Sequence, residues 1–192
     1  MPFTTLPTSA YTTLDATKLT GNLPAISGAS LTGISAGITE YDEWFVTSSF
    51  TGDADPISSN WARAGSNTFD KIGIGMSQSS GIFTFPSTGI WKVEFYAYHA
   101  NNNGNDRNLG MMIQKTVNNN TYDEAAITET GIARNTSAWY YMSQTACATL
   151  DITSTSLRKV RFKIVKVDSN TETSCSGTVA KTGVKFMRIG DT

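Results

Sequence analysis

Residues 89–100 read GIWKVEFYAYHA, and their side chains alternate between apolar and polar or amphipathic types. One set of alternate positions holds Trp91, Val93, Phe95 and Ala97. The other set holds Lys92, Glu94, Tyr96 and Tyr98. Successive side chains of a strand point to opposite faces, so a period of two predicts a strand with one buried face.

The same period recurs in three later segments. It is carried by Leu109, Met111, Ile113 and Val117, by Val160, Phe162 and Ile164, and by Val184 and Phe186 ahead of Ile189-Gly190. Weaker patterns predict strands at 44–50, 68–76, 82–86, 122–132 and 137–150. Turn clusters separate these segments and no helical stripe is present, so the sequence predicts an all-β sandwich.

Large aromatic residues fall on both faces of two predicted strands. A two-layer sandwich buries only one face of each sheet, so the second face is either wet or covered by another subunit. We expect a subunit contact, and its candidates are Tyr96, Tyr98, Trp139 and Tyr141. The alternative is a scatter of exposed aromatic side chains, which is common.

Residues 1–40 are predicted to form an extended arm in front of a head domain at 41–192. Within the arm, Leu19-Thr20-Gly21 returns twelve residues later as Leu31-Thr32-Gly33. Each repeat offers only one or two aliphatic side chains, so the arm cannot bury a core of its own. We expect it to pack on sister chains or a larger assembly through Leu14, Leu19, Leu23, Ile26, Leu31, Ile34 and Ile38.

The charge composition excludes some partners. The chain has 15 basic and 16 acidic residues, and only 16% of its residues are charged. This balance argues against nucleic-acid binding through a basic surface. Membrane insertion is not expected, because no run of about 18 apolar residues exists, and the first residues do not resemble a secretory signal.

Residues suited to catalysis or metal binding are few. The single histidine, His99, is expected at the surface or at an interface, at the end of its strand, rather than in a Ser-His-Asp relay. Cys147 and Cys175 are predicted to be half-buried thiols, with one disulfide as the alternative. The oxygen-rich segments 53–55 and 103–106 lack the spacing of a calcium loop. We therefore predict no enzyme, no metal and no cofactor.

Two Asn-rich loops, at 101–108 and 118–121, are predicted to lie at one tip of the sandwich. Amide groups donate and accept hydrogen bonds, which suits sugar hydroxyls, and tyrosine rings offer stacking faces. The candidates for a glycan or receptor site are Asn101, Asn102, Asn103, Asn105, Asn119 and Tyr122. The alternative is that these segments only form turns.

Two parts of the chain resemble known families. Residues 82–95, IFTFPSTGIWKVEF, resemble the strand–turn–strand of the complement-type globular head, which has the tumour-necrosis-factor-like jelly roll. Residues 149–162 and 183–190 look like later strands of that fold, so the resemblance covers about 44–192. Residues 14–33, LDATKLTGNLPAISGASLTG, resemble the linker repeats of bacteriophage fibre and virion structural proteins.

Together the resemblances imply a trimeric jelly-roll β-sandwich with an extended N-terminal arm. They imply a non-enzymatic phage virion protein, a homotrimeric tail-fibre or adhesin tip that the arm joins to capsid or tail proteins and that binds host glycans. A capsid-decorating head-fibre trimer is the alternative, because forty residues reach at most about 130–140 Å. A glycan-degrading enzyme is a remote alternative. Either kind of virion protein, the fibre tip or the capsid-decorating trimer, would be assembled in the host cytoplasm and would lie on the virion surface.

Overall fold

The computed structural model describes residues 37–64, 70–101, 108–131, 138–165 and 170–192. Within these ranges the chain forms thirteen strands and no helix, which confirms the all-β prediction. Six of the seven arm candidates lie outside the described residues, namely Leu14, Leu19, Leu23, Ile26, Leu31 and Ile34. The division into arm and head therefore stays a prediction.

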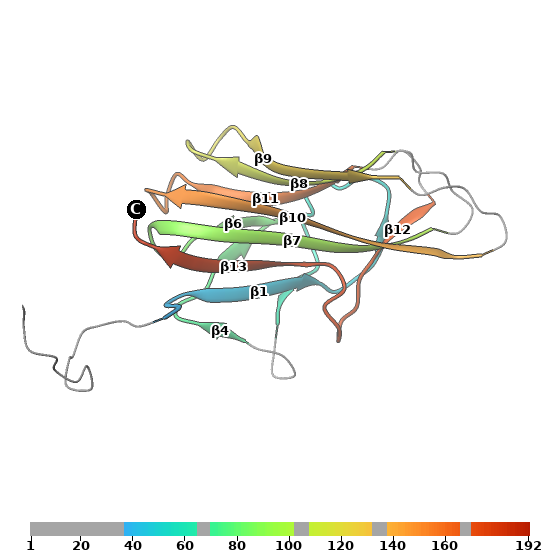
Figure 1. The fold of residues 1–192 in the computed structure, drawn as a ribbon, viewed down its shortest axis with the longest axis horizontal. Coiled ribbons are helices and arrows are strands. Elements are labelled where there is room, and N and C mark those ends of the chain that lie inside the picture. The colour runs from blue at the N-terminus through green and yellow to red at the C-terminus, as the bar shows by residue number, and fades with distance from the viewer. Residues whose placement is uncertain (1–36, 65–69, 102–107, 132–137, 166–169) are drawn as a thin grey trace, which may run out of the picture. The chain divides into compact units, whose positions relative to one another are not determined.

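The strands form two antiparallel sheets (Figure 1). The eight-stranded sheet contains β1 (Tyr41–Val46), β2 (Phe50–Thr51), β3 (Trp61–Arg63), β4 (Lys71–Ile72), β7 (Gly89–Asn101), β10 (Tyr140–Ile152), β12 (Thr171–Ser174) and β13 (Gly183–Gly190). The five-stranded sheet contains β5 (Ser77–Ser79), β6 (Ile82–Thr84), β8 (Leu109–Thr116), β9 (Asp123–Thr130) and β11 (Lys159–Val165).

Strand β7 organises the eight-stranded sheet. Its whole length pairs with β10 on one side, from Gly89 opposite Ile152 to Asn101 opposite Tyr140. On its other side β13 pairs with the first part and β12 with the last part. Strand β1 follows β13, and β3 and β4 pair with the far edge of β1. The five-stranded sheet has the order β5-β6-β11-β8-β9.

The core lies between the sheets and is rich in aromatic rings. The predicted apolar face of β7 is confirmed, because Trp91, Val93 and Phe95 are buried. The ring of Phe83 lies 5.4 Å from that of Phe162 and 5.3 Å from that of Phe186, measured between centroids. Such ring pairs contribute stability beyond the area that they bury.

Three strand predictions need correction. Among the described residues of the predicted strand 68–76, only the short β4 is a strand, because Gly73 and Gly75 have positive φ and turn the chain away. Val117 lies beyond the end of β8 and is 48% exposed, so it does not extend the apolar face of that strand. The first strand is β1, which starts earlier than predicted and ends at Val46.

The prediction that His99 lies at the surface or an interface was wrong. The residue is fully buried, with Nδ1 3.4 Å from Thr173 Oγ1. Strand β7 does not end there, because β10 and β12 pair with it as far as Asn101. His99 therefore lies in the middle of the sheet, with a paired strand on each side.

Candidate functional site

Three of the four predicted interface residues form a row of parallel rings on the outer face of the eight-stranded sheet. Tyr98 of β7 stacks on Tyr141 of β10 with centroids 5.8 Å apart and planes 15° apart. Trp139 stacks on Tyr141 at 6.4 Å and 12°. Trp139 and Tyr141 are 51% and 60% exposed. The row therefore offers an aromatic surface that is open at Trp139 and Tyr141 and half-buried at Tyr98.

The fourth candidate, Tyr96, lies on the same outer face, and its side chain extends across β13 to β1. Its hydroxyl donates a hydrogen bond of 2.9 Å to Glu43 Oε1 on β1. Between them lies Gly183 of β13, where an added Cβ would stand 2.5 Å from Tyr96 Oη. A glycine at this position thus lets the tyrosine lie flat across β13. Tyr41 Oη also donates to Glu43, over 3.4 Å.

The environment of these phenols keeps them neutral. Burial, and then the nearby Glu43 carboxylate, raises the pKa of Tyr41 to about 12. The same two causes, in the same order, raise the pKa of Tyr96 well above its ordinary value. Both effects disfavour a phenolate, so each tyrosine remains a hydrogen-bond donor at neutral pH.

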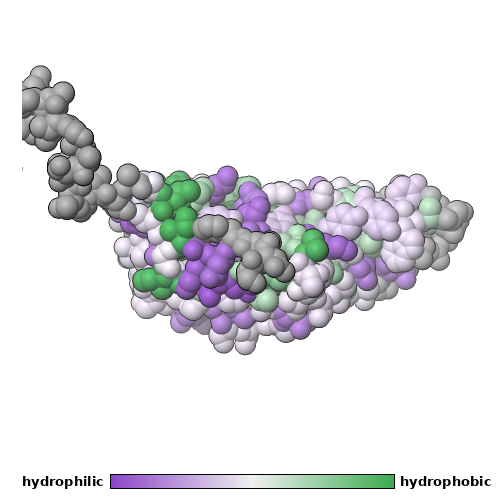
Figure 2. Space-filling model, turned by 90° about the horizontal axis from the view of Figure 1, so that it is seen from below, coloured by the Kyte–Doolittle hydropathy of each residue, from purple (hydrophilic) through white to green (hydrophobic). Residues whose placement is uncertain are grey.

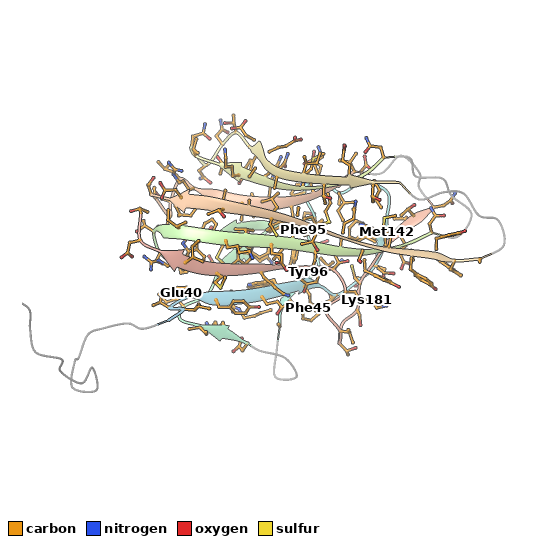
Figure 3. All side chains as sticks on the ribbon, viewed as in Figure 1. Glu40, Phe45, Phe95, Tyr96, Met142 and Lys181 are labelled. Carbon is orange, nitrogen blue, oxygen red and sulfur yellow. The ribbon has the colours of Figure 1, made fainter. Side chains whose placement is uncertain are left out.

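Lysines border the aromatic residues of this face. Figure 3 labels Tyr96, Lys181 and Phe45, which lie along the eight-stranded sheet. The ammonium of Lys181 lies 5.8 Å from the centroid of the Tyr98 ring, and that of Lys185 lies 5.2 Å from the Tyr96 ring. An open groove of about 360 Å³ runs between Tyr96, Tyr98 and Lys181 and strand β10. The face is therefore amphipathic rather than purely apolar.

A smaller apolar group lies at the start of the described chain. Ile38, Ile72 and Ile74 are exposed, and Ile38 is the one arm candidate that the structure describes. Ile72 pairs with Tyr41, and the backbone N–H of Ile74 donates to the Glu40 carboxylate. Figure 2 shows hydrophobic side chains gathered at one end of the face that it draws.

The predicted glycan loops do not share one tip. Asn108 precedes β8 and Asn118 follows it, so the two loops lie at opposite ends of that strand. This is what an antiparallel hairpin dictates, because successive connections alternate between ends of the sandwich. Asn101 is 2% exposed and donates a hydrogen bond to Thr171 Oγ1, so its amide is not offered to a ligand. The other three candidates of this loop lie outside the described residues: Asn102, Asn103 and Asn105.

The second loop is a compact turn. Asn118 Oδ1 accepts hydrogen bonds of 2.9 Å from the backbone N–H groups of Asn120 and Thr121. Asn119 is exposed and has φ +58, which asparagine tolerates in turns. The guanidinium of Arg161 lies 4.2 Å from the centroid of the Tyr122 ring. One stacking face of that tyrosine is therefore occupied within the chain.

The geometry around the other polar candidates does not favour metal binding. The Asp55 carboxylate contacts Lys163 Nζ at 2.7 Å and Arg161 Nη2 at 3.5 Å, so two cations already balance it. Across the described ranges, no three His, Cys, Asp or Glu residues are grouped to hold a metal ion. Neither cysteine is in a disulfide in the described chain; Cys175 is half-buried as predicted, but Cys147 is exposed, because it lies at an outward-facing position of β10. No helix of the described chain is long and apolar enough to cross a membrane.

Sequence reasoning missed the residues that support the aromatic face. Glu43, Gly183 and Lys181 are far from Tyr96 and Tyr98 in the sequence and meet them only through the pairing of β1, β7 and β13. A pattern within one strand carries no information on this register.

Comparisons with known proteins identify the fold. The sequence matches no protein-family model, and no curated protein matches it. The structure is similar to murine APRIL at pH 5.0, with a TM-score of 0.51, 11% identity, and coverage of 78% of this chain and 98% of that one. It is also similar to Eiger TNF from S. frugiperda, with a TM-score of 0.53, 10% identity, and coverage of 79% and 93%. The head therefore has the tumour-necrosis-factor-like jelly-roll fold.

Proposed function

We propose that this chain is a homotrimeric, non-enzymatic structural protein of the bacteriophage virion surface, used for host attachment. The outer face of the eight-stranded sheet forms the contact between subunits. The observation that carries this proposal is the row of stacked rings formed by the exposed Trp139 and Tyr141 and the half-buried Tyr98, with Tyr96 beside it. The phage origin is supported by the resemblance of residues 14–33 to linker repeats.

Burial of the aromatic row is a sufficient reason for self-association. Complete burial of an aromatic side chain removes about 150–250 Å² from water, and association would remove the half or so that Trp139 and Tyr141 still expose, at about 25 cal/mol per Å² of apolar area. Aromatic residues are also enriched at the centres of protein interfaces. A second copy of the chain is the partner that the resemblance to trimeric heads implies.

Two charged groups of this face, Glu43 and Lys185, already have partners within the chain, which lowers the cost of burying them. Glu43 accepts hydrogen bonds from two tyrosines. Lys185 Nζ lies 3.8 Å from Glu94 Oε1. A carboxylate that keeps its partner when water leaves has a smaller desolvation penalty than an isolated one.

In this proposal the arm joins the trimer to capsid or tail proteins, and three heads bind host glycans together. Three linked copies strengthen weak contacts by raising the effective concentration of each site. The second candidate function is a capsid-decorating trimer that stabilises the shell.

Phage that lack this chain distinguish the two functions. Attachment predicts that the mutant particles stop adsorbing to the host while their heads keep normal heat resistance. Shell stabilisation predicts fragile heads with normal adsorption. A purified protein that cleaves host polysaccharide would support the enzyme alternative instead.

The arm is tested by a chain that lacks residues 1–38. We expect a folded head, with the circular dichroism of the full chain, that is absent from purified particles. Incorporation of the truncated chain at the normal level would refute the anchoring role.

A further inference from the structure

We propose that the outer face of the five-stranded sheet carries a binding groove for a carboxylate-bearing saccharide. The proposal rests on the host-attachment function above and assigns a place and a ligand class to it. The groove has a volume of about 480 Å³, a size typical of ligand sites. It is lined by Ser77, Ser79, Ser80, Ile82, Thr84 and Lys159.

Strand pairing places the groove residues in two rows across the sheet. In the first row, Ser77 of β5 pairs with Thr84 of β6, which pairs with Lys159 of β11. In the second row, Ser79 pairs with Ile82, which pairs with Arg161. Small side chains on β5 and β6 thus form the floor, and the long cationic side chains of β11 form one wall.

The floor is held rigidly by the hairpin between β5 and β6. Ser80 and Gly81 both have positive φ, at +51° and +77°, which is the pattern of a tight two-residue turn. The backbone N–H of Gly81 donates to Gln78 Oε1 over 3.1 Å. A Cβ on Gly81 would collide with the Ile57 carbonyl oxygen, so the turn is pressed against the neighbouring loop. A groove that needs no reordering loses little entropy on binding.

The chemistry of the lining suits a sugar. Serine and threonine hydroxyls both donate and accept hydrogen bonds, as sugar hydroxyls do. Ile82 adds a small apolar surface for the C–H face of a pyranose ring. The groove combines several hydroxyl partners with one apolar contact, which is a poor match for a purely apolar ligand.

Lys159 is the residue that makes the groove prefer a ligand with an anionic group. Its neighbours on β11, Arg161 and Lys163, both contact the Asp55 carboxylate. Among the described residues, no carboxylate lies within salt-bridge distance of Lys159. Its ammonium is therefore the cation of the groove that is left to bind the carboxylate of a ligand.

The groove lies on the sheet opposite to the proposed subunit contact. A trimer that buries the outer face of the eight-stranded sheet leaves the five-stranded sheet open. Three copies of the groove then stay accessible on one assembly, which raises the avidity for a repeating polysaccharide.

Binding of labelled oligosaccharides to the full chain tests the proposal. The probes are a galacturonic acid tetramer, its uncharged methyl ester, sialyllactose and inorganic phosphate, followed by fluorescence polarisation or competition. We expect at least one carboxylate sugar to bind, and more tightly than the uncharged ester. Phosphate is expected to compete only weakly, because it cannot use the hydroxyl floor.

Variants locate the site. Lys159→Gln is expected to weaken binding of the charged sugar about tenfold, as loss of a charge-assisted hydrogen bond does. Ser77→Leu, which fills the floor, is expected to weaken charged and uncharged sugars alike. Lys71→Gln is the matched control, because Lys71 is an exposed lysine on β4, in the other sheet and outside the groove, and it is expected to leave the affinity unchanged.

The proposal is overturned if neither carboxylate sugar binds, or if Lys159→Gln and Ser77→Leu both leave the affinity unchanged. It is also overturned if phosphate competes as well as the sugars, since the site would then be a general anion site. None of these results affects the mass of the assembly or its place in the particle, so failure of the groove is distinguishable from failure of the proposed function.

Discussion

Asp42 is the residue that fastens β1 to the elements beside it. Its carboxylate accepts hydrogen bonds from Arg63 Nε and Trp44 Nε1, both at 2.9 Å. It also accepts one from the backbone N–H of Met76 at 2.6 Å, and Arg63 Nη2 donates to the Met76 carbonyl oxygen. One buried carboxylate thus holds β1, β3 and the segment before β5 together.

Asp42→Ala is therefore expected to lower the free energy of unfolding by about 3 kcal/mol, because it leaves Arg63 and the Met76 N–H without their acceptor. Asp55→Ala is the control. The Asp55 carboxylate forms ion pairs too, with Arg161 and Lys163, but it is exposed. A loss of at most about 1 kcal/mol is therefore expected. Urea unfolding at one protein concentration measures both. Equal losses of unfolding free energy in the two variants would contradict the role of the Asp42 carboxylate in holding these elements together.

The buried tyrosines make stability depend on alkaline pH. Tyr41 and Tyr96 have a raised pKa in the folded chain, so folding favours their neutral forms. The stabilisation that comes from their neutral forms is complete below about pH 10, the ordinary pKa of tyrosine. It is lost for Tyr41 as the pH rises through about 12, and for Tyr96 at a still higher pH. Unfolding curves between about pH 9 and pH 12 should show a steep decline that is shallower in Tyr96→Phe. The same slope in both proteins would contradict the burial of this phenol.

For single residues, the sequence predicted faces but not partners. The alternation in 89–98 assigned each side chain of that stretch to the correct side. The burial of His99 and Asn101 was missed, although both continue the alternate positions of the apolar face of β7; the sequence does not show that β12 pairs with this end of the strand. The partner of Tyr96 depends in the same way on the register of β1 and β13.

Among the elements, the β5–β6 hairpin shows how backbone geometry and packing combine. Gly81 and Gly52 have nearly the same φ, +77° and +75°, but differ in their surroundings. A Cβ on Gly81 would meet the Ile57 backbone, whereas a Cβ on Gly52 would meet nothing within 4 Å.

Comparison of Gly81→Ala with Gly52→Ala separates these two effects. Both substitutions carry the cost of a left-handed conformation, about 1–2 kcal/mol. Gly81→Ala is expected to lose a further ~1–3 kcal/mol, the cost of overpacking, because the hairpin must move away from the loop. Thermal unfolding measures the difference. A loss for Gly81→Ala no larger than that for Gly52→Ala would contradict the tight contact.

Strands with an apolar pattern of their own were predictable, and strands without one were not. Clear alternation predicted β7, β8, β11 and β13, and weaker patterns predicted β6, β9 and β10. Strands β5 and β12 consist of small polar residues, SQS and TETS, and have no such pattern. They exist because β6 and β7 offer free edges with which they pair.

For the whole molecule, the resemblance of 82–95 gave the correct jelly-roll fold. The composition alone supported only an all-β sandwich. The shared tip of the two Asn-rich loops was a wrong prediction, since it ignored the strand between them. Aromatic residues on both sides of a strand exceed what one core can bury, and Tyr96, Tyr98 and Tyr141 do lie on the face away from the core; their role in a subunit contact stays a prediction.

The mass of the full chain in solution decides whether the aromatic face holds a trimer together. Sedimentation equilibrium at micromolar concentration should give three times the chain mass of 20.7 kDa. Tyr98→Ala combined with Tyr141→Ala should shift the protein to monomer, while Ile127→Ser, a change at an exposed residue of the other sheet, should leave the trimer intact. A stable 20.7 kDa monomer of the unmodified chain would contradict the proposed assembly.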